Sequence, residues 1–375
     1  MERGSVHGTR ILGAFPPDGE SHEYPPPPLP TIPHVSRGAL GVRRLDDPPE
    51  AWWDAICLRA RSPWHASTST ILQGEFGVRS TRLVAEMDGS PVGVLAVHYA
   101  GARRLKLMDP LVGTIARVPA GPAVDSAPAG TTSVLVDAAH QEIAATGAVS
   151  ATWRMDLPDP EAEGALRALG YQLRPYGVGL FTLPASAQDL EAAIHSKSRN
   201  LVRKARKAGV EVAPEPGVET LLPLLNASFR RSGLEPRDAE YVRRSFESQA
   251  CEVLVARLKG IPIAALMWHP FGTLGRYMFH GRTDGDTAGA SNLLLLEMFR
   301  RGIEKGVRLF HAGDVALDRE KDEKLLSITH FKERMGFRVV PTYEASIVLR
   351  PIGKALRDSA LGAWRRLKSG GGEAV

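Results

Sequence analysis

The sequence predicts a mixed α/β protein built from two copies of one α/β unit, and a two-part internal repeat is the reason. Residues 83–95 (LVAEMDGSPVGVL) and 254–266 (LVARLKGIPIAAL) share the pattern L-V-A-x-x-x-G-x-P-[VI]-[GA]-x-L. Residues 169–175 (LGYQLRP) and 335–341 (MGFRVVP) share G-[YF]-x-[LV]-x-P. The first pair is offset by 171 residues, from 83 to 254, and the second by 166, from 169 to 335. Because both echoes occur in the same order at nearly the same offset, we interpret them as two copies of one unit.

Each copy has the same predicted order of elements. Apolar runs on either side of Gly89 and of Gly260 predict a β-hairpin whose second strand begins with a proline. A further strand follows, then a long helix, another strand, a second helix and a closing strand. In the second copy, Gly306 predicts the end of the long helix. After the hairpins, the predicted strand, long helix and next strand are 103–108, 132–145 and 149–155 in the first copy, and 275–280, 291–304 and 307–311 in the second.

Composition is typical of a folded protein and excludes several classes. The 375 residues are 43% hydrophobic and 24% charged, with a net charge of +5, and the length suits two domains. This charge permits an anionic partner without demanding one. Cys57 and Cys251 stand far apart with no CxxC spacing, which fits a reducing compartment and argues against a disulfide framework or a zinc site. The start lacks an apolar signal-peptide core and no apolar run is long enough to span a bilayer, so we expect a cytoplasmic protein.

The order of elements, an antiparallel hairpin followed by a crossing helix and further strands, resembles the GNAT acyltransferase fold. A tandem pair of such units joined by a basic helix resembles the Fem family of non-ribosomal peptidyltransferases, which use aminoacyl-tRNA to add residues to peptidoglycan precursors. The resemblance covers nearly the whole chain after a Pro-rich start, and it is closest to members without a coiled-coil arm. The matching segments are ILQGEFG (71–77), RVPAGPAVD (117–125), ATWRMDLPD (151–159), SKSRNLVRKARKAGVEV (196–212), RYMFHGRTDGD (276–286) and HFKERMGF (330–337).

The resemblance implies a division into two GNAT-like domains. We expect a disordered Pro-rich arm at 1–38, with no role beyond that of a tether in its simplest interpretation. A first domain on the acceptor side is expected at 39–190, a basic linker helix at 191–213, and a second, catalytic domain on the donor side at 214–350. A basic amphipathic helix and tail at 351–375 would either rest on an anionic membrane as a peripheral contact or dock on the second unit.

The loop that binds coenzyme A in an ordinary GNAT acetyltransferase is missing from both copies. That loop, [QR]-x-x-G-x-[GA], begins the long helix, and its backbone N–H groups face the pyrophosphate. In the first copy, the glycine and prolines of RVPAGPA do not fit the spacing of this pattern. In the second copy, Asp284 and Asp286 stand where phosphates would bind. The absence argues against acetyl-CoA as the donor. Aminoacyl-tRNA is the donor that the resemblance implies.

The basic stretch 196–212 is the most specific match, with six positive charges in eleven residues and no acid. As a helix it is expected to pack on a stripe of Leu201, Ala205 and Ala208 and to turn its charges outward. Such a run is either a solvated face or a surface for an anion, which could be tRNA or an acceptor diphosphate. We assign the donor tRNA to Arg203, Arg206 and Lys207, and an acceptor phosphate to Lys197 and Arg199.

Lys332 is the strongest single candidate for catalysis. Peptidyl transfer from an ester passes through a tetrahedral oxyanion, which a fixed ammonium can stabilise. The resemblance to the Phe-Lys pair of the family implies this role for Lys332, and it implies that Phe331 stacks on the terminal adenine of tRNA. The alternative for Lys332 is an exposed lysine in the helix before Gly336.

Asp156 closes a strand and matches the Arg-x-Asp of the family. It would accept a proton from the attacking amine or orient it, with a smaller effect than a typical general base because proton transfer can be assisted by the substrate. The alternative is a salt bridge with Arg154. On the acceptor side, family members carry a lysine and aromatic residues after the Leu-Gln segment, whereas this chain has Arg79, which could take over a phosphate contact.

The remaining polar and aromatic candidates have simpler interpretations. His280 and His311 lie at predicted strand ends and would either touch the donor or be buried, satisfied histidines. Cys251 has no nearby histidine or acid in sequence, so we expect it in the core. Three tryptophans are expected to pack rather than to bind substrate, namely Trp52, Trp53 and Trp64.

These observations favour a Fem-like aminoacyltransferase, cytoplasmic and without a cofactor or metal, that transfers an aminoacyl group from tRNA to an amine acceptor. The acceptor would be a peptidoglycan precursor, nucleotide- or lipid-linked, or a small amine of specialised metabolism. One alternative is an acyl-CoA-dependent GNAT N-acyltransferase that has lost the standard loop. Another is a non-catalytic pseudo-acyltransferase that binds RNA or a cell-wall polymer through its basic helix.

Overall fold

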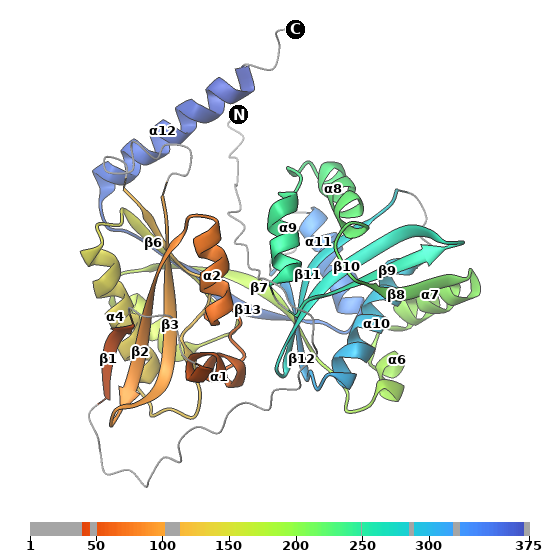
Figure 1. Cartoon of the computed structure of the whole chain (residues 1–375), viewed down its shortest axis with the longest axis horizontal. Helices are drawn as coiled ribbons and strands as arrows, with labels where there is room; N and C mark the ends of the chain where they lie inside the picture. Colours follow the sequence, from red (N-terminus) through yellow and green to blue (C-terminus); the bar gives the residue numbers. More distant parts are fainter. Residues whose placement is uncertain are drawn as a thin grey trace.

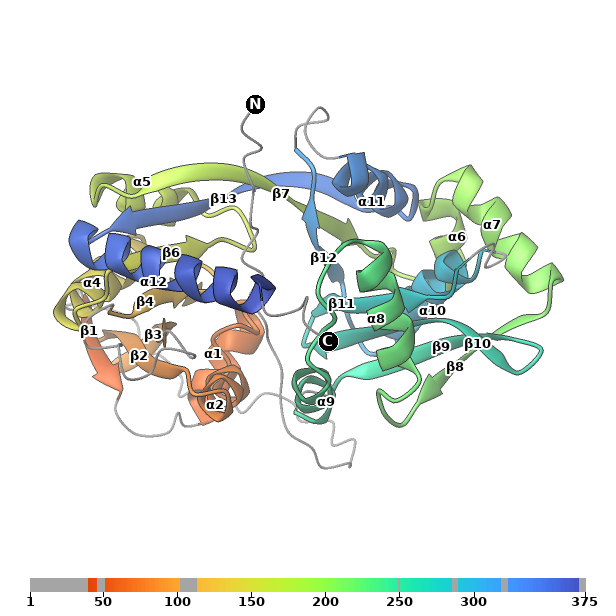
Figure 2. The ribbon, with the colours of Figure 1, turned by 90° about the horizontal axis from the view of Figure 1, so that it is seen from above.

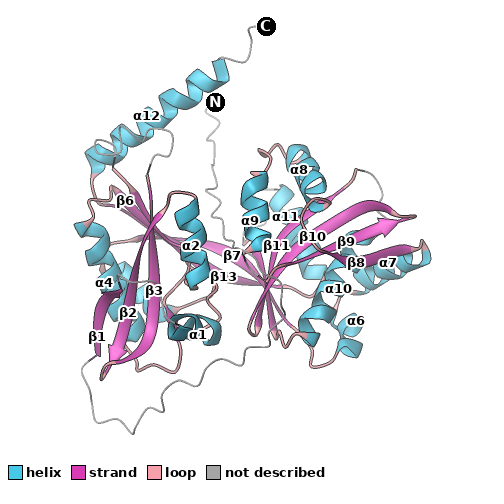
Figure 3. Ribbon diagram, in the orientation of Figure 1, coloured by secondary structure: helices cyan, strands magenta, loops and turns pink. Residues whose placement is uncertain are grey.

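The structure, a computed structural model, describes residues 40–45, 51–101, 113–248, 250–284, 289–317 and 323–370. The predicted Pro-rich arm at 1–38, the predicted strand at 103–108 and Asp286 lie outside these residues. Within them, thirteen strands form one sheet, and helices cover its faces (Figure 3). The strands are β1 Leu40–Leu45, β2 Arg79–Met87, β3 Ser90–Ala100, β4 Ile115–Val118, β5 Ala123–Val124, β6 Ser150–Arg154, β7 Gln172–Thr182, β8 Val210–Glu215, β9 Glu252–Leu258, β10 Ile261–Phe271, β11 Leu274–Arg282, β12 Leu309–Val315 and β13 Arg338–Val348.

The first unit follows the predicted order. Its hairpin, β2 and β3, turns at Asp88 and Gly89, which have φ of 51° and 76°, as a tight hairpin turn requires. The parallel pairing of β4 with β6 follows the crossing of the long helix between them. Two helices lie on one face of the sheet and two on the other, and each face has its own apolar core. The helices are α1 Ala51–Arg59, α2 Ser67–Glu75, α4 Thr131–Ala145 and α5 Pro160–Ala168.

The second unit repeats this arrangement. Its hairpin, β9 and β10, turns at Lys259 and Gly260 with φ of 52° and 79°, and β11 pairs with β12 in parallel. The run of leucines in α10 is buried on all sides because the helix packs between the sheet and α7. Among the described residues between β8 and β9, only α8 and α9 occur, so there is no coiled-coil arm. The helices are α6 Leu190–Ala193, α7 Ser196–Lys207, α8 Leu221–Arg231, α9 Ala239–Glu247, α10 Ala290–Glu304 and α11 Glu323–Arg334.

Two long strands join the units. The sheet order is β1-β2-β3-β4-β6-β13-β7-β12-β11-β10-β9-β8, with β5 beside β3. The last strand of the chain, β13, therefore lies between β6 and β7 of the first unit, and β7 pairs with β12 of the second. Figure 2 shows β7 and β13 running across the molecule from one unit to the other. The predicted tandem α/β architecture is confirmed, and the exchange brings the ends of β6 and β12 together at the junction.

The packed stripe of α7 differs from the predicted one. Its buried residues are Ser198, Val202 and Ala205, whereas Leu201 is 39% exposed and Ala208 is exposed. The prediction chose the larger apolar side chain at 201. The helix instead turns Val202 into the core of the second unit and places Ser198 near Asn292, whose Nδ2 lies 3.4 Å from the Ser198 hydroxyl.

The C-terminal helix α12, Pro351–Gly370, extends away from the body of the molecule (Figure 1). Its anchor is Arg357, which is buried and donates hydrogen bonds to the backbone carbonyls of Gly113 and Ala100. These contacts are with the first unit, not with the second as the docking alternative expected. Ile352 and Leu356 are exposed on this helix, and the predicted membrane contact stays a prediction. No helix in the described part of the chain is long and apolar enough to cross a bilayer.

Candidate functional site

The junction between the two units brings Asp156 and the end of β12 together. The backbone N–H of Met155, next to Asp156, donates to the carbonyl of Tyr343 in β13. On the other side, His311 of β12 places Nε2 3.2 Å from the backbone oxygen of Asp156. The loop that carries Asp156 is thus attached both to the first unit and to the second.

The carboxylate of Asp156 is partly buried and unpaired. Within the described residues it makes no hydrogen bond and no ion pair, although Arg276 and Arg154 lie nearby. Burial raises the pKa of Asp156 to about 7, against the opposing charges of the two arginines and with a smaller contribution from Asp314. A carboxylate with a pKa near neutrality is suited to accept a proton from an amine.

Arg154 does not form the salt bridge with Asp156 that the structural alternative expected. Its guanidinium pairs with Asp314 of β12, lies 3.5 Å from a carboxylate oxygen of Glu344, and stacks on the ring of Tyr176 with Cζ 4.3 Å from the centroid. This side chain therefore connects the two units through its ion pair with Asp314. It leaves the Asp156 carboxylate free for another partner.

Lys332 is buried in α11, with 7% of its surface exposed, so it is not the exposed lysine of the alternative interpretation. Its ammonium donates to the backbone carbonyls of Ala312 and Asp314 at the end of β12, at 2.7 and 2.8 Å. Burial lowers the pKa of Lys332 to about 8, while the charge of Asp314 acts in the opposite direction. An ammonium has three donors, so two carbonyls leave one N–H for a further acceptor.

Phe331 lines a cavity of about 430 Å³ between α7, α10 and α11. The other lining residues are Ser198, Leu201, Asn292, Glu323, Leu326, Ser327, His330 and Arg334. The cavity therefore lies directly beside the basic helix α7. An aromatic face next to a basic surface is suited to a nucleoside that carries phosphates.

The charges of α7 fall into two groups. Arg199 donates to the carbonyls of Glu191 and Ile194, and Arg206 pairs with the carboxylate of Glu191, which lies outside the basic run. Within the described parts of the chain, the side chain of Arg203 bonds only to the amide oxygen of Asn200, at 3.1 Å. Lys197 and Lys207 are exposed and have no partner among the described residues. The free positive charges of the helix are therefore at Lys197, Arg203 and Lys207.

Of the two candidate histidines, His311 is buried and His280 is half-buried, and each makes hydrogen bonds within the protein. His311 accepts from the N–H of Gly313 at Nδ1 and therefore donates from Nε2 to Asp156, and burial, together with the charge of Arg276, lowers its pKa to about 3. His280 contacts the Ser291 hydroxyl at 3.0 Å, and burial lowers its pKa to about 4. Neither is placed to act as an acid or base near neutral pH.

Other predicted residues lie away from the junction or in the core. Arg79 stacks over Tyr99, which packs in the core beneath α4, and it makes no contact with Asp156. Cys251 is buried, as is Trp53. Trp64 packs within the protein, as expected, and its partner is Arg276 of the second unit, whose Cζ lies 3.4 Å from the ring centroid.

Sequence reasoning missed Arg276, Trp64 and Asp314. Arg276 stands within the matched segment RYMFHGRTDGD, and a charged residue in a strand otherwise buried or half-buried is the signal that could have identified it. No local pattern could pair it with Trp64, because the contact joins residues far apart in the chain.

The N-termini of the two long helices both lie against other parts of the protein. At α4, the carboxylate of Glu161 accepts a hydrogen bond of 2.8 Å from the N–H of Ser133. At α10, a Cβ added to Gly289 would lie 2.4 Å from the carbonyl oxygen of Leu201, so α7 packs directly against this end. An acidic side chain in one unit and a helix backbone in the other thus stand where a GNAT acetyltransferase binds pyrophosphate.

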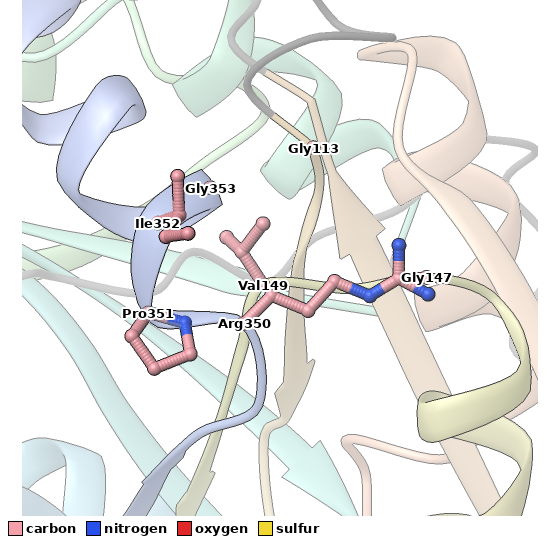
Figure 4. Close-up of a pocket in the computed structure, with 7 residues that line it drawn as sticks. All are labelled: Gly113, Gly147, Val149, Arg350, Pro351, Ile352 and Gly353. Atoms are coloured by element: carbon pink, nitrogen blue, oxygen red, sulfur yellow. The ribbon is translucent and has the colours of Figure 1, made fainter.

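A second cavity, of about 340 Å³, lies at the start of α12 near Gly113, Gly147 and Val149 (Figure 4). The side chain of Arg350 reaches toward Gly147 there, and none of the candidate residues lines this cavity. In the described residues, no group of three or more His, Cys, Asp or Glu side chains could hold a metal ion.

Comparison with known proteins identifies the class that these features define. Residues 193–322 match the family described as Acetyltransferase (GNAT) domain, so most of the second unit is similar to a GNAT acyltransferase domain. With its repeat in the first unit, the chain has a tandem GNAT fold. None of the curated proteins compared with the sequence matches it.

Among solved structures, FemX superposes with a TM-score of 0.71 at 14% sequence identity, over 82% of this chain and 98% of FemX. A conserved protein of unknown function from Bacteroides thetaiotaomicron VPI-5482 has a TM-score of 0.50 at 12% identity, over 78% of this chain and 91% of that one. A tandem GNAT protein from the clavulanic acid biosynthesis pathway has a TM-score of 0.47 at 15% identity, over 83% and 99%. The chain therefore has the fold seen in FemX.

Proposed function

We propose that this protein is an aminoacyltransferase that forms a peptide bond between an aminoacyl-tRNA donor and an amine acceptor. The observation that carries the proposal is Lys332, a buried ammonium held by two carbonyls at the junction where Asp156 lies unpaired. The FemX-like fold, the carboxylate of Glu161 at the N-terminus of α4 and the packing of α7 against the N-terminus of α10 support tRNA over coenzyme A as the donor.

In the proposed reaction, the acceptor amine attacks the ester carbonyl of the aminoacyl-tRNA. A C–N bond forms, the C–O bond to the terminal ribose breaks, and the negative charge that develops on the carbonyl oxygen is stabilised by the remaining N–H of Lys332. Asp156 takes the proton that the amine loses, and the proton finally passes to the ribose oxygen that leaves. No metal or cofactor takes part in this scheme.

Donor binding would use the cavity beside α7. Phe331 offers an aromatic face for the terminal adenine, and the free charges at Arg203 and Lys207 would meet the phosphates of the acceptor stem. The acceptor would be a peptidoglycan precursor, nucleotide- or lipid-linked, or a small amine. In either case the nucleophile must reach the junction between the units.

The test is a transfer assay with labelled, charged total tRNA, offered with cell-wall precursors and with a panel of small amines. We expect label to appear in an amide product only with charged tRNA present. Pretreatment with RNase should abolish transfer, and Lys332→Met should reduce it while Lys305→Met, a surface change at the end of α10, leaves it intact. Transfer that survives RNase, or that is unchanged in Lys332→Met, would sink the proposal.

A second candidate function, an acyl-CoA-dependent N-acyltransferase, is favoured by the match to the Acetyltransferase (GNAT) domain family. It requires the pyrophosphate to bind without the usual helix N-terminus. Thermal unfolding distinguishes the two, because a ligand that binds the native state raises the midpoint. A shift with acetyl-CoA and none with charged tRNA would favour this candidate over the first.

A further inference from the structure

Arg276 presents an unpaired guanidinium at the junction. The side chain extends from β11 in the second unit and lies flat against Trp64 of the first. Among the described residues, no hydrogen bond or ion pair involves this guanidinium. Stacking uses only the face of the planar cation, so the N–H donors along its edge are available for a planar anion.

Asp156 presents an unpaired carboxylate at the same place. The parallel pairing of β11 and β12 sets Arg276 beside His311, and Nε2 of His311 lies 3.2 Å from the backbone oxygen of Asp156. Arg276 is the strongest charged influence on the Asp156 carboxylate, yet the two groups do not form an ion pair with one another. The guanidinium of Arg276 and the carboxylate of Asp156 thus lie at the same junction without forming an ion pair with each other.

The surrounding charges are balanced. Among the described residues, the charged groups that act on Asp156 are Arg276, Arg154 and Asp314, so with Asp156 itself two positive charges stand against two negative ones. A phosphate, with its higher negative charge, would meet two carboxylates here. A molecule that carries one positive and one negative group matches both the balance and the separation.

We propose that the amine acceptor is a compact zwitterion, a free amino acid or a molecule of the same kind, whose carboxylate binds to Arg276 while its amine lies at Asp156. This inference rests on the proposed function, because it names the acceptor of that transfer. The carboxylate forms a bidentate contact with the guanidinium, which fixes the acceptor. The amine, held at Asp156, then has one orientation toward the donor ester.

The binding test uses isothermal titration calorimetry of the full-length protein without tRNA. Each of the standard amino acids is titrated, and each one that binds is compared with its methyl ester, which keeps the amine but loses the negative charge. We expect at least one amino acid to bind, and its ester to bind about tenfold to a hundredfold more weakly, as for loss of a charge-assisted bidentate contact. If no amino acid binds, or the esters bind equally well, the inference is overturned.

Two variants refine the result. Arg276→Lys keeps the charge over Trp64 but loses the planar fork, so it should lower the affinity for the amino acid about tenfold and leave that for the ester unchanged. Arg167→Met, on the exposed face of α5, is the matched control and should bind as the wild type does. Equal binding by Arg276→Lys would contradict the inference. If this variant fails to fold, the comparison of amino acid and ester still tests the inference, because it uses only the wild-type protein.

The inference and the proposed function can fail separately. Transfer from charged tRNA to amines that lack a carboxylate, undiminished in Arg276→Lys, would overturn the zwitterion site and leave the proposed function standing. Binding of an amino acid that depends on Arg276, with no transfer from any charged tRNA, would support the site and contradict the proposed donor.

Discussion

The helices α5 and α11 occupy equivalent places in the two units and differ at one telling position. Leu166 in α5 and Lys332 in α11 each stand four residues before the glycine that ends the helix, and both side chains are buried. Leu166 fills the core of the first unit. Lys332 instead directs an ammonium to the carbonyls at the end of β12. Burial of a charge needs a reason that burial of a leucine does not, and we interpret the reason as chemistry.

The acids at the ends of the corresponding strands β6 and β12 also differ, but here it is the first unit that has the group without a partner. Asp314, in the second unit, pairs with Arg154 and is more than half exposed. Asp156, in the first unit, has no such partner and has a pKa raised to about 7. Leu166 in the first unit and Asp314 in the second thus have structural roles. Under the proposed function, one group of each copy contributes to a single site, and the exchange of β7 and β13 brings the two groups to the same junction.

The largest effect is expected from making the two helices alike. In Lys332→Leu, which copies Leu166, transfer should fall about 100- to 1,000-fold because the oxyanion loses a fixed donor. The free energy of unfolding should change by no more than about 2 kcal/mol, because relief of the buried charge offsets the two carbonyls left without a donor. Single-turnover transfer and urea unfolding measure the two quantities.

A conservative change at the equivalent position of the first unit is the control for this prediction. Leu166→Met should alter stability by less than about 1.5 kcal/mol and leave transfer unchanged, since it only repacks the first core. A large loss of stability in Lys332→Leu with full activity per folded molecule would show that the lysine is structural.

The next effect concerns pH. Asp156 must be ionised to accept a proton, so activity should rise as pH increases through about 7. Lys332 must be protonated to stabilise the oxyanion, so activity should fall as pH increases through about 8. The rate should therefore follow a narrow bell, measured as initial single-turnover rates corrected for spontaneous ester hydrolysis. Asp156→Asn should lower the maximum about 10- to 100-fold and remove the acidic limb.

The corresponding acid of the other unit tests whether this assignment is specific. Asp314→Asn removes a negative charge that raises the pKa of Asp156, so the acidic limb should move to lower pH and not disappear. An acidic limb that persists in Asp156→Asn would assign it to another group.

Much of the fold could be predicted from the sequence, because the repeat depends on local patterns. The long helices and β6 were predicted within one residue of their observed bounds, since apolar periodicity determines them. The hairpin turns were also predicted correctly from their glycines, although the strands extend up to five residues beyond 83–95 and 254–266. The position of β13 in the sheet of the first unit could not be predicted, because a closing strand has the same sequence pattern whichever strand it pairs with. The strand β4 was missed because four residues are too few to show alternation.

The site could be predicted only in part. Motif resemblance identified Asp156, Phe331 and Lys332, and the structure brings Asp156 and Lys332 to the same junction. Arg276 and Trp64 were missed because their contact joins the two units, and nothing in either local segment indicates it. In the stripe of α7, Ala205 was predicted correctly, but Leu201 was chosen in place of the buried Val202 because it is larger, and it faces solvent.

A smaller effect is expected at α7, where free and paired charges can be compared. Arg203→Ala combined with Lys207→Ala removes two unpaired charges, so the slope of log affinity for tRNA against log salt should fall by about 1.5 to 2. Arg206→Ala should change the slope less, because Glu191 already neutralises that charge. Filter binding over a salt series measures both, with Arg300→Ala on α10 as the control. Equal slopes for the double variant and the wild type would mean that tRNA does not meet this helix.

The smallest effect is expected at the N-terminus of α4, where the carboxylate of Glu161 accepts a backbone hydrogen bond. At the corresponding end of α10 in the second unit, the helix α7 lies in that place. Glu161→Ala removes the carboxylate that accepts from Ser133 and should lower the free energy of unfolding by about 1 kcal/mol. Glu163→Ala, which loses only an exposed ion pair with Arg167, should cost less than about 0.5 kcal/mol. Transfer should be unchanged in both variants. If Glu161→Ala instead gains binding of acetyl-CoA, the carboxylate has been blocking a working pyrophosphate site, and the first unit, not the second, has kept the ancestral donor position.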